Sequence, residues 1–220
     1  MGCALALVGF ALVPVAKVTT WGACLHWSYA TRAWLGFCQS MPEGRMLVRH
    51  ELTFIRTAPE DAAKMILKRA RELNIPLTAV LAQPDLFPKE KHRGETISQT
   101  FAQHGVMLRP GDDDAVNGWS RLRSWFQLRD GVPAMQIDRS CVHLLRTLPT
   151  IIADEKNPDD IQDTPDANPV KALRYYVMSR PQPWQRDPAE VPGPGTWGYE
   201  LRNVGKAPSR EFVGSSLYSR

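Results

Sequence analysis

The chain has 220 residues with 43% hydrophobic content, which suits one domain with a sizeable core. Its net charge of +4 is an ordinary surface surplus that favours anionic partners only weakly. The four cysteines lie far apart without a Cys-x-x-Cys pair, so neither a zinc site nor a disulfide framework is indicated, and a reduced, intracellular protein is expected.

An apolar segment occupies most of residues 1–20. It lacks the charged start of a signal peptide, and it is shorter than the roughly 20 apolar residues that a membrane-spanning helix needs. We therefore predict no membrane segment here. A buried strand, or a start codon assigned upstream of the real domain, explains the segment better than export does.

Residues 21–55 have the pattern of β-strands. Strands are predicted at Cys24–Tyr29, Ala33–Cys38 and Arg45–Phe54, with a turn at Pro42–Gly44 before the third. The third strand alternates apolar and polar residues, as a half-buried strand does.

A helix and a further strand follow. Thr57–Glu60 has the sequence of a capping box, and the apolar periodicity continues the helix over 58–73. The next apolar run, Leu77–Ala82, predicts a central strand flanked by Cys24–Tyr29 and Arg45–Phe54.

The second half of the chain alternates helices and strands in the same way. Asp112–Asp114 precedes a helix, where acidic residues act as an N-cap and favour the helix dipole. The inward stripe of that helix is predicted to comprise Val116, Trp119, Leu122 and Phe126. The remaining predicted elements are a helix at Glu95–His104 closed by Gly105, strands at Val106–Arg109 and Met135–Ile137, a helix at Cys141–Leu148 and an acidic loop at 152–168.

Strands that first form hairpins and are then separated by helices indicate an α/β domain with a mixed central sheet flanked by helices. We assign this domain to residues 21–180. Residues 181–220 are rich in Pro, Gly and Arg without periodicity, which predicts a flexible tail.

Six short blocks stand in order along the domain. They are His26-Trp-Ser-Tyr29, Leu81-Ala-Gln-Pro-Asp-Leu-Phe87, Gly94-Glu-Thr-Ile-Ser98, Asn117-Gly-Trp119, Leu145-Arg-Thr-Leu-Pro149 and Ala172-Leu-Arg-Tyr175. Together they resemble the C-terminal nuclease domain of phage terminase large subunits. The resemblance implies an RNase H-like sheet, in which carboxylates from the first strand, a middle strand and the last helix converge on Mg²⁺ or Mn²⁺.

The three positions at which that family carries carboxylates are substituted here. His26 and Gln83 stand where the family has Asp, and Lys171 replaces the acidic residue just before the last block. Nearby carboxylates are Asp85, which shares a strand face with Gln83 if the strand extends past Pro84, and Asp163 and Asp166 upstream of the last helix.

The candidate catalytic residues are therefore His26, Gln83, Asp85, Asp163 and Asp166, and a metal site would use His26, Asp85 and Asp166. The alternative for His26 is a strand histidine without a metal role, because a neutral imidazole suits Mg²⁺ poorly.

The resemblance implies cleavage of double-stranded DNA during genome packaging, in the cytoplasm of a bacterial host and with no membrane involved. Its partners would be a terminase ATPase domain or small subunit and the portal. The sequence has no Walker A loop, since Ala207 follows Gly205-Lys206 where Ser or Thr is required.

The substituted positions raise a second hypothesis, a nuclease-inactive DNA-binding or packaging-assembly module. A transposase-like enzyme would need an acidic residue in the first strand, and residues 24–38 supply none.

Overall fold

The structure is a computed structural model that describes residues 20–41, 44–87, 94–129, 131–181 and 183. Apart from a few residues at their inner ends, the predicted N-terminal segment (1–20) and tail (181–220) lie outside this range. So do Pro42 and Glu43 of the predicted turn, and residues 88–93. No helix within the described part of the chain is long and apolar enough to cross a bilayer.

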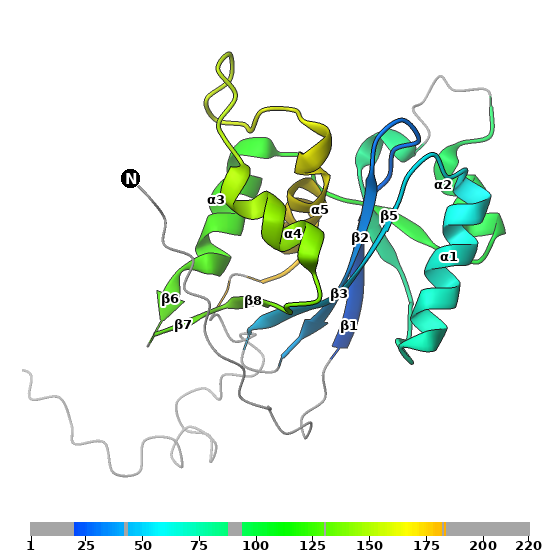
Figure 1. The fold of residues 1–220 in the computed structure, drawn as a ribbon, viewed down its shortest axis with the longest axis horizontal. Coiled ribbons are helices and arrows are strands. Elements are labelled where there is room, and N and C mark those ends of the chain that lie inside the picture. Colours follow the sequence, from blue (N-terminus) through cyan, green and yellow to red (C-terminus); the bar gives the residue numbers. More distant parts are fainter. Residues whose placement is uncertain (1–19, 42–43, 88–93, 130, 182, 184–220) are drawn as a thin grey trace, which may run out of the picture. The chain divides into compact units, whose positions relative to one another are not determined.

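Six strands form one mixed sheet in the order β5-β4-β1-β2-β3-β8 (Figure 1). The strands are β1 (Thr20–His26), β2 (Ala33–Ser40), β3 (Met46–Phe54), β4 (Val80–Ala82), β5 (Leu108–Pro110) and β8 (Met135–Ile137). Strands β1, β2 and β3 form an antiparallel meander, while β4, β5 and β8 add to it in parallel. This confirms the predicted mixed α/β sheet.

The predicted neighbours of the middle strand are wrong in one respect. β4 lies between β1 and β5, whereas the strand at 46–54 pairs with β2 and β8. Consecutive strands joined by short connections pair with one another, so β2 occupies one edge of β1. The other edge of β1 then remains for β4.

Helices cover both faces of the sheet, α1 and α2 on one and α3, α4 and α5 on the other (Figure 1). The helices are α1 (Pro59–Glu72), α2 (Ile97–Gln103), α3 (Ala115–Phe126), α4 (Val142–Thr147) and α5 (Asn168–Met178). Short 3-10 turns occupy Pro84–Leu86, Leu148–Thr150 and Pro165–Ala167, and a two-stranded ribbon joins β6 (Leu128–Arg129) to β7 (Val132–Pro133).

Each face of the sheet carries its own hydrophobic core. Leu35 and Phe37 of β2 point toward α1 and α2, whereas Trp34 and Cys38 point toward the α3–α5 face. This is the period-two alternation of a strand that is buried on both sides. β2 therefore anchors both layers.

The capping box predicted at Thr57–Glu60 does not form. Ala58 precedes Pro59 and is extended (φ −64°, ψ 155°), as a residue before proline tends to be, so the helix begins at Pro59 without a side-chain cap. Thr57 instead donates its hydroxyl hydrogen to the carbonyl of Ile55. A capping box does form at α2, between Thr96 and Gln99.

The buried stripe of α3 also differs from the prediction. Gly118, Leu122 and Trp125 are buried, while Val116 is 57% exposed. Trp119 and Phe126 are only partly buried. The Asp114 side chain accepts a hydrogen bond from the Asn117 backbone N–H, which confirms the predicted N-cap.

Candidate functional site

The substituted positions do converge, at the end of the sheet where β1 and β4 finish. These strands run parallel with Leu25 opposite Ala82, so His26 and Gln83 follow at the same edge. α5 packs across β1, β2 and β4 and brings Lys171 to this edge, where it acts electrostatically on His26. Strand register and helix packing thus assemble three residues that lie far apart in the sequence.

Gln83 is engaged by the backbone of Trp27. Its Oε1 accepts the Trp27 N–H at 2.9 Å, and its Nε2 donates to the Trp27 carbonyl at 2.5 Å. The side chain is buried, and both ends of the amide are used. Gln83 therefore ties the end of β4 to the end of β1, and its neutral amide oxygen already accepts one hydrogen bond.

His26 is held neutral. Burial is the main cause that lowers its pKa to about 4, and the charges of Lys171 and Arg174 lower it further while Asp163 opposes them. Its ring stacks on Tyr175 with centroids 6.5 Å apart and an interplanar angle of 15°. Within the described residues, its Nδ1 is buried without a hydrogen-bond partner.

Lys171 forms an ion pair with Asp163. The ammonium lies 2.5 Å from Asp163 Oδ1, and the Lys171 side chain is only 18% exposed, against 87% for that of Asp163. The hydrogen bond from Lys171 is the main cause that lowers the pKa of Asp163. The carboxylate that lies beside the substituted third position is thus already neutralised by a cation within the protein.

Arg174 is also committed to contacts within the protein. Its Nη2 donates to Asp113 Oδ1 at 2.8 Å, and its guanidinium lies over the rings of Trp119 and Tyr175, at 5.0 Å and 5.1 Å from their centroids. These contacts join α5 to α3 and to the loop that precedes it.

Two glycines allow α5 to approach this closely. A Cβ at Gly111 would lie 2.5 Å from Cβ of Tyr175, and one at Gly118 would lie 2.7 Å from Cγ of Arg174. Real Cβ atoms essentially never show such distances. The position of α5 therefore depends on glycine, which has no side chain, at these two sites.

The remaining candidate carboxylates lie in different places. β4 ends at Ala82 and Asp85 follows in a 3-10 turn, so the strand-face argument that would align Asp85 with Gln83 does not hold. Asp85 still acts electrostatically on Tyr175, which places it near the His26 cluster. Asp166 lines a separate pocket with Arg32, Trp34 and His143.

These donors do not fit a divalent metal. Mg²⁺ and Mn²⁺ prefer oxygen ligands, and a two-metal site needs several carboxylates. The edge instead presents a neutral imidazole, an amide bound on both ends and an ammonium paired with Asp163. Among the described residues, no three His, Cys, Asp or Glu side chains are placed to share an ion.

The low pKa of His26 predicts a dependence of stability on pH. The unfolded chain binds a proton on this histidine near pH 6.5, whereas the folded chain does so only near pH 4, so the free energy of unfolding falls as pH drops through this window. The loss is up to about 3 kcal/mol and is complete below pH 4. Denaturation measured between these pH values should show a smaller loss for His26→Asn. Identical slopes for the two proteins would contradict the burial of a neutral His26.

Solved structures show the same architecture. The chain matches the P22 large terminase nuclease domain with a TM-score of 0.58 and 15% identity, over 73% of this chain and 80% of that one. It matches the nuclease domain of the large terminase from bacteriophage SPP1, solved with bound Mn, with a TM-score of 0.51 and 17% identity, over 71% of this chain and 84% of that one. No protein-family model and no curated protein matches the sequence.

A longer large terminase gives the same result. The large terminase of a thermophilic bacteriophage, solved in complex with ATP-gamma-S, matches with a TM-score of 0.57 and 12% identity over 72% of this chain. The chain spans 39% of the length of that protein. The domain is therefore RNase H-like. More specifically, it has the fold of the nuclease domain of phage large terminases.

Sequence reasoning missed several residues of this region. Arg32, His143 and Arg146 meet beside Asp166 although more than a hundred residues separate Arg32 from His143. The double hydrogen bond of Gln83 to the Trp27 backbone also left no signal in the sequence. Both depend on tertiary packing, which residue spacing does not report.

Proposed function

We propose that the chain is a nuclease domain of a phage or prophage terminase large subunit whose metal site has been lost, and that it acts as a DNA-binding module in genome packaging. One observation carries the proposal: the edge of the sheet expected to bear metal-binding carboxylates bears His26, Gln83 and Lys171, with Lys171 paired to Asp163. The fold supports the terminase origin.

The electrostatics of the edge oppose a divalent cation. Each unit charge interacts with a divalent ion by several kcal/mol at an effective dielectric of about 20, and the Lys171–Asp163 pair leaves no net negative charge at this position to attract the ion. Lys171 is mostly buried, which limits screening by solvent. The ion pair with Asp163 also removes the nearest carboxylate from the set of ligands.

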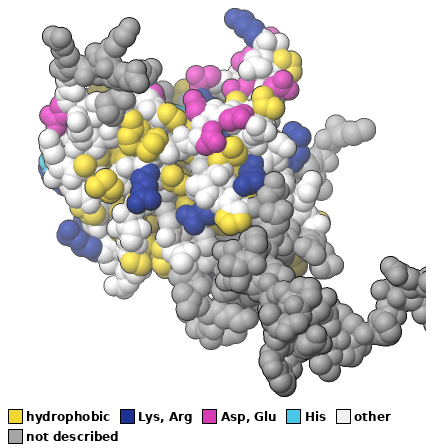
Figure 2. All heavy atoms as spheres, turned by 180° about the vertical axis from the view of Figure 1, so that it is seen from behind, with side chains coloured by type: hydrophobic (Ala, Val, Ile, Leu, Met, Phe, Trp, Pro, Cys, Tyr) yellow, Lys and Arg dark blue, Asp and Glu magenta, His cyan; other side chains and the backbone are white. Residues whose placement is uncertain are grey.

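Double-stranded DNA is the proposed partner. The further partners would be a terminase ATPase domain, a small subunit or the portal, in the cytoplasm of the bacterial host. On the face shown in Figure 2, Lys and Arg side chains stand apart among uncharged and hydrophobic ones, and acidic side chains gather toward one end. On this face, binding would therefore depend on local phosphate sites more than on one broad basic patch.

A cleavage assay combined with a binding assay tests the proposal. We expect the protein to bind duplex DNA in a salt-dependent manner, and to produce no EDTA-sensitive nicking of supercoiled plasmid in either Mg²⁺ or Mn²⁺. Gel electrophoresis measures the nicking, and fluorescence anisotropy of a labelled duplex measures the binding. Absence of binding at low salt would refute the DNA-binding role.

The second candidate function is metal-dependent cleavage by a rearranged site of His26, Asp85 and Asp166. The bound Mn of the SPP1 domain supports divalent metal use in this fold. Asp166 lies in the pocket beside Arg32, however, and the contacts that place Asp163 and Asp85 near His26 do not include it. Robust EDTA-sensitive cutting by the unmodified protein would favour this candidate over the first.

A further inference from the structure

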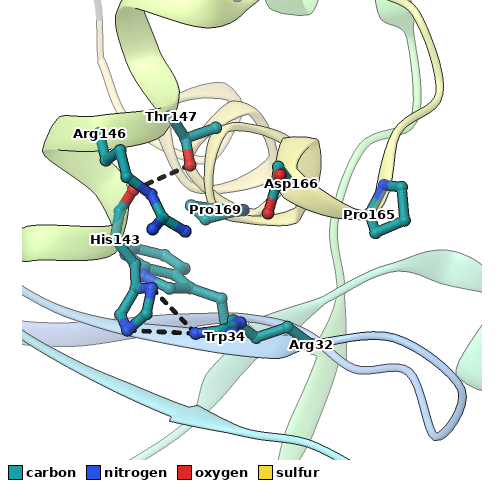
Figure 3. Close-up of a pocket in the computed structure, with 8 residues that line it drawn as sticks. All are labelled: Arg32, Trp34, His143, Arg146, Thr147, Pro165, Asp166 and Pro169. Carbon is teal, nitrogen blue, oxygen red and sulfur yellow. Dashed lines mark hydrogen bonds between the residues drawn. The ribbon is translucent and has the colours of Figure 1, made fainter.

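A small pocket lies where the β1–β2 turn, α4 and the start of α5 meet (Figure 3). Its cavity volume is about 10 Å³, which is room for roughly one water molecule. A group that binds here therefore contacts the side chains at the mouth of the pocket and is not enclosed by it.

Cationic side chains dominate the pocket. Arg32 and Arg146 line it together with His143 and Asp166. Arg32 Nη1 lies 3.1 Å and 3.4 Å from the two ring nitrogens of His143, so the histidine helps to hold that arginine in place. In Figure 3 the guanidinium of Arg146 and the carboxylate of Asp166 both turn into the space above Trp34.

Neither arginine is neutralised by the carboxylates around it. Within the described part of the chain, neither Arg32 nor Arg146 makes an ion pair. The nearby Glu51 accepts hydrogen bonds from Trp34 Nε1 and from the backbone N–H groups of His143 and Leu144, at 2.8, 2.8 and 3.1 Å. Its charge is thus used to hold the start of α4.

The geometry of the walls is fixed by hydrogen bonds. Asn168 Nδ2 donates to the Arg32 carbonyl at 2.7 Å and to Thr31 Oγ1 at 3.2 Å, which ties the β1–β2 turn to α5. Thr147 Oγ1 donates to the His143 carbonyl at 2.8 Å within α4. The two arginines therefore project from segments whose backbones are held near one another.

We infer that this pocket binds a phosphodiester group of double-stranded DNA, with Arg32 and Arg146 as its ligands. Guanidinium groups match the oxygens of a phosphate with paired N–H donors, and two of them outweigh the single opposing charge of Asp166. Both arginines are exposed enough to reach a phosphate on a duplex backbone. The inference rests on the proposed DNA-binding function and names the site that carries part of it.

The position of the pocket supports this assignment. Pro169, which lines the pocket, and Lys171, at the substituted edge, both lie in the first turn of α5, which rises only about 5.4 Å per turn. Duplex DNA carries one phosphate per 3.4 Å along each strand, roughly. A duplex lying over the substituted edge would therefore pass within a few phosphates of Arg32.

The test compares three variants of the full chain by anisotropy of a labelled DNA duplex at several salt concentrations. The first variant combines Arg32→Ala with Arg146→Ala. The second is Asp166→Asn. The control combines Lys68→Ala with Arg71→Ala, which removes two exposed cations from α1, on the other face of the sheet.

Loss of one phosphate contact lowers the slope of log affinity against log salt by about 0.9. For the double arginine variant, we therefore expect the ratio of Kd values at about 200 and 50 mM salt to fall about 3.5-fold relative to wild type. The control should retain the wild-type ratio. Asp166→Asn should bind DNA several-fold more tightly, because it removes the carboxylate that lines the pocket.

The outcomes separate the two proposals. The pocket assignment alone is overturned if the wild-type protein binds DNA and the arginine variant keeps the wild-type ratio of Kd values. It is also overturned if Asp166→Asn does not bind DNA more tightly than the wild-type protein. No binding by the wild-type protein overturns the DNA-binding function, and the pocket assignment with it. Asp166→Asn keeps the inference testable if the arginine variant misfolds, since misfolding does not raise affinity.

Discussion

The triple variant His26→Asp, Gln83→Asp, Lys171→Asp is expected to gain metal-dependent cleavage of DNA. It replaces one ammonium and two neutral side chains with three carboxylates at an edge where the three positions already meet. Because each unit charge interacts with a divalent ion by several kcal/mol even at an effective dielectric of about 20, this change decides whether Mg²⁺ or Mn²⁺ binds. Plasmid nicking should rise from background to a clear, EDTA-sensitive signal.

A neutral triple variant is the matched control. His26→Asn, Gln83→Asn, Lys171→Asn removes the ammonium and shortens Gln83 in the same way, but adds no carboxylate. It should remain inactive in both metals, with a circular dichroism spectrum like that of the acidic variant. Equal cleavage by the two triple variants would show that removing Lys171, rather than adding ligands, restores activity. If the acidic triple variant folds but does not cleave DNA, the three substituted side chains alone do not explain the inactivity of the wild-type protein.

Leu122→Ala on α3 is expected to lower the free energy of unfolding by about 2–5 kcal/mol. The side chain is only 5% exposed and packs in the core between α3–α5 and the sheet, so truncation leaves a cavity as well as losing apolar burial. Chemical denaturation with a constant m-value measures the loss.

Val116→Ala on the same helix is the control for that change. Val116 is 57% exposed, and surface substitutions of this kind usually alter stability by less than about 0.5 kcal/mol. A decrease of about 2 kcal/mol or more in the free energy of unfolding for Val116→Ala, which is the cost of truncating a core residue, would show that Val116 is buried as the sequence predicts. It would contradict the helix orientation described above.

Much of the fold could be predicted because its determinants are local. The apolar runs of β1, β2 and β3 and the Gly105 that ends the α2 segment each have their signal within a few residues. The errors arise where a neighbour in space decides the outcome. The buried stripe of α3 begins at Gly118 because Arg174 packs there, and no periodicity within 115–126 reports that contact.

The site was predictable in position and not in detail. The ordered blocks placed His26, Gln83 and Lys171 at the three converging positions, and the structure brings these residues to one edge. The sequence did not show that β4 stops at Ala82, so that Asp85 sits in a 3-10 turn. Nor did it show that Asp166 turns toward Arg32, because Asp166 lies in a second 3-10 turn whose direction depends on packing.

The glycines beneath α5 imply that the backbone shape of the substituted edge does not depend on the side chains of His26, Gln83 and Lys171. Gly22 of β1, Gly111 and Gly118 leave room for side chains of α5 to pack directly on the backbone, so close packing sets the distance of the helix from its supports. Neither His26, Gln83 nor Lys171 takes part in these close contacts. The charges at this edge can therefore change while its backbone shape is kept. The same fold can carry a different side-chain chemistry at this edge through substitution alone.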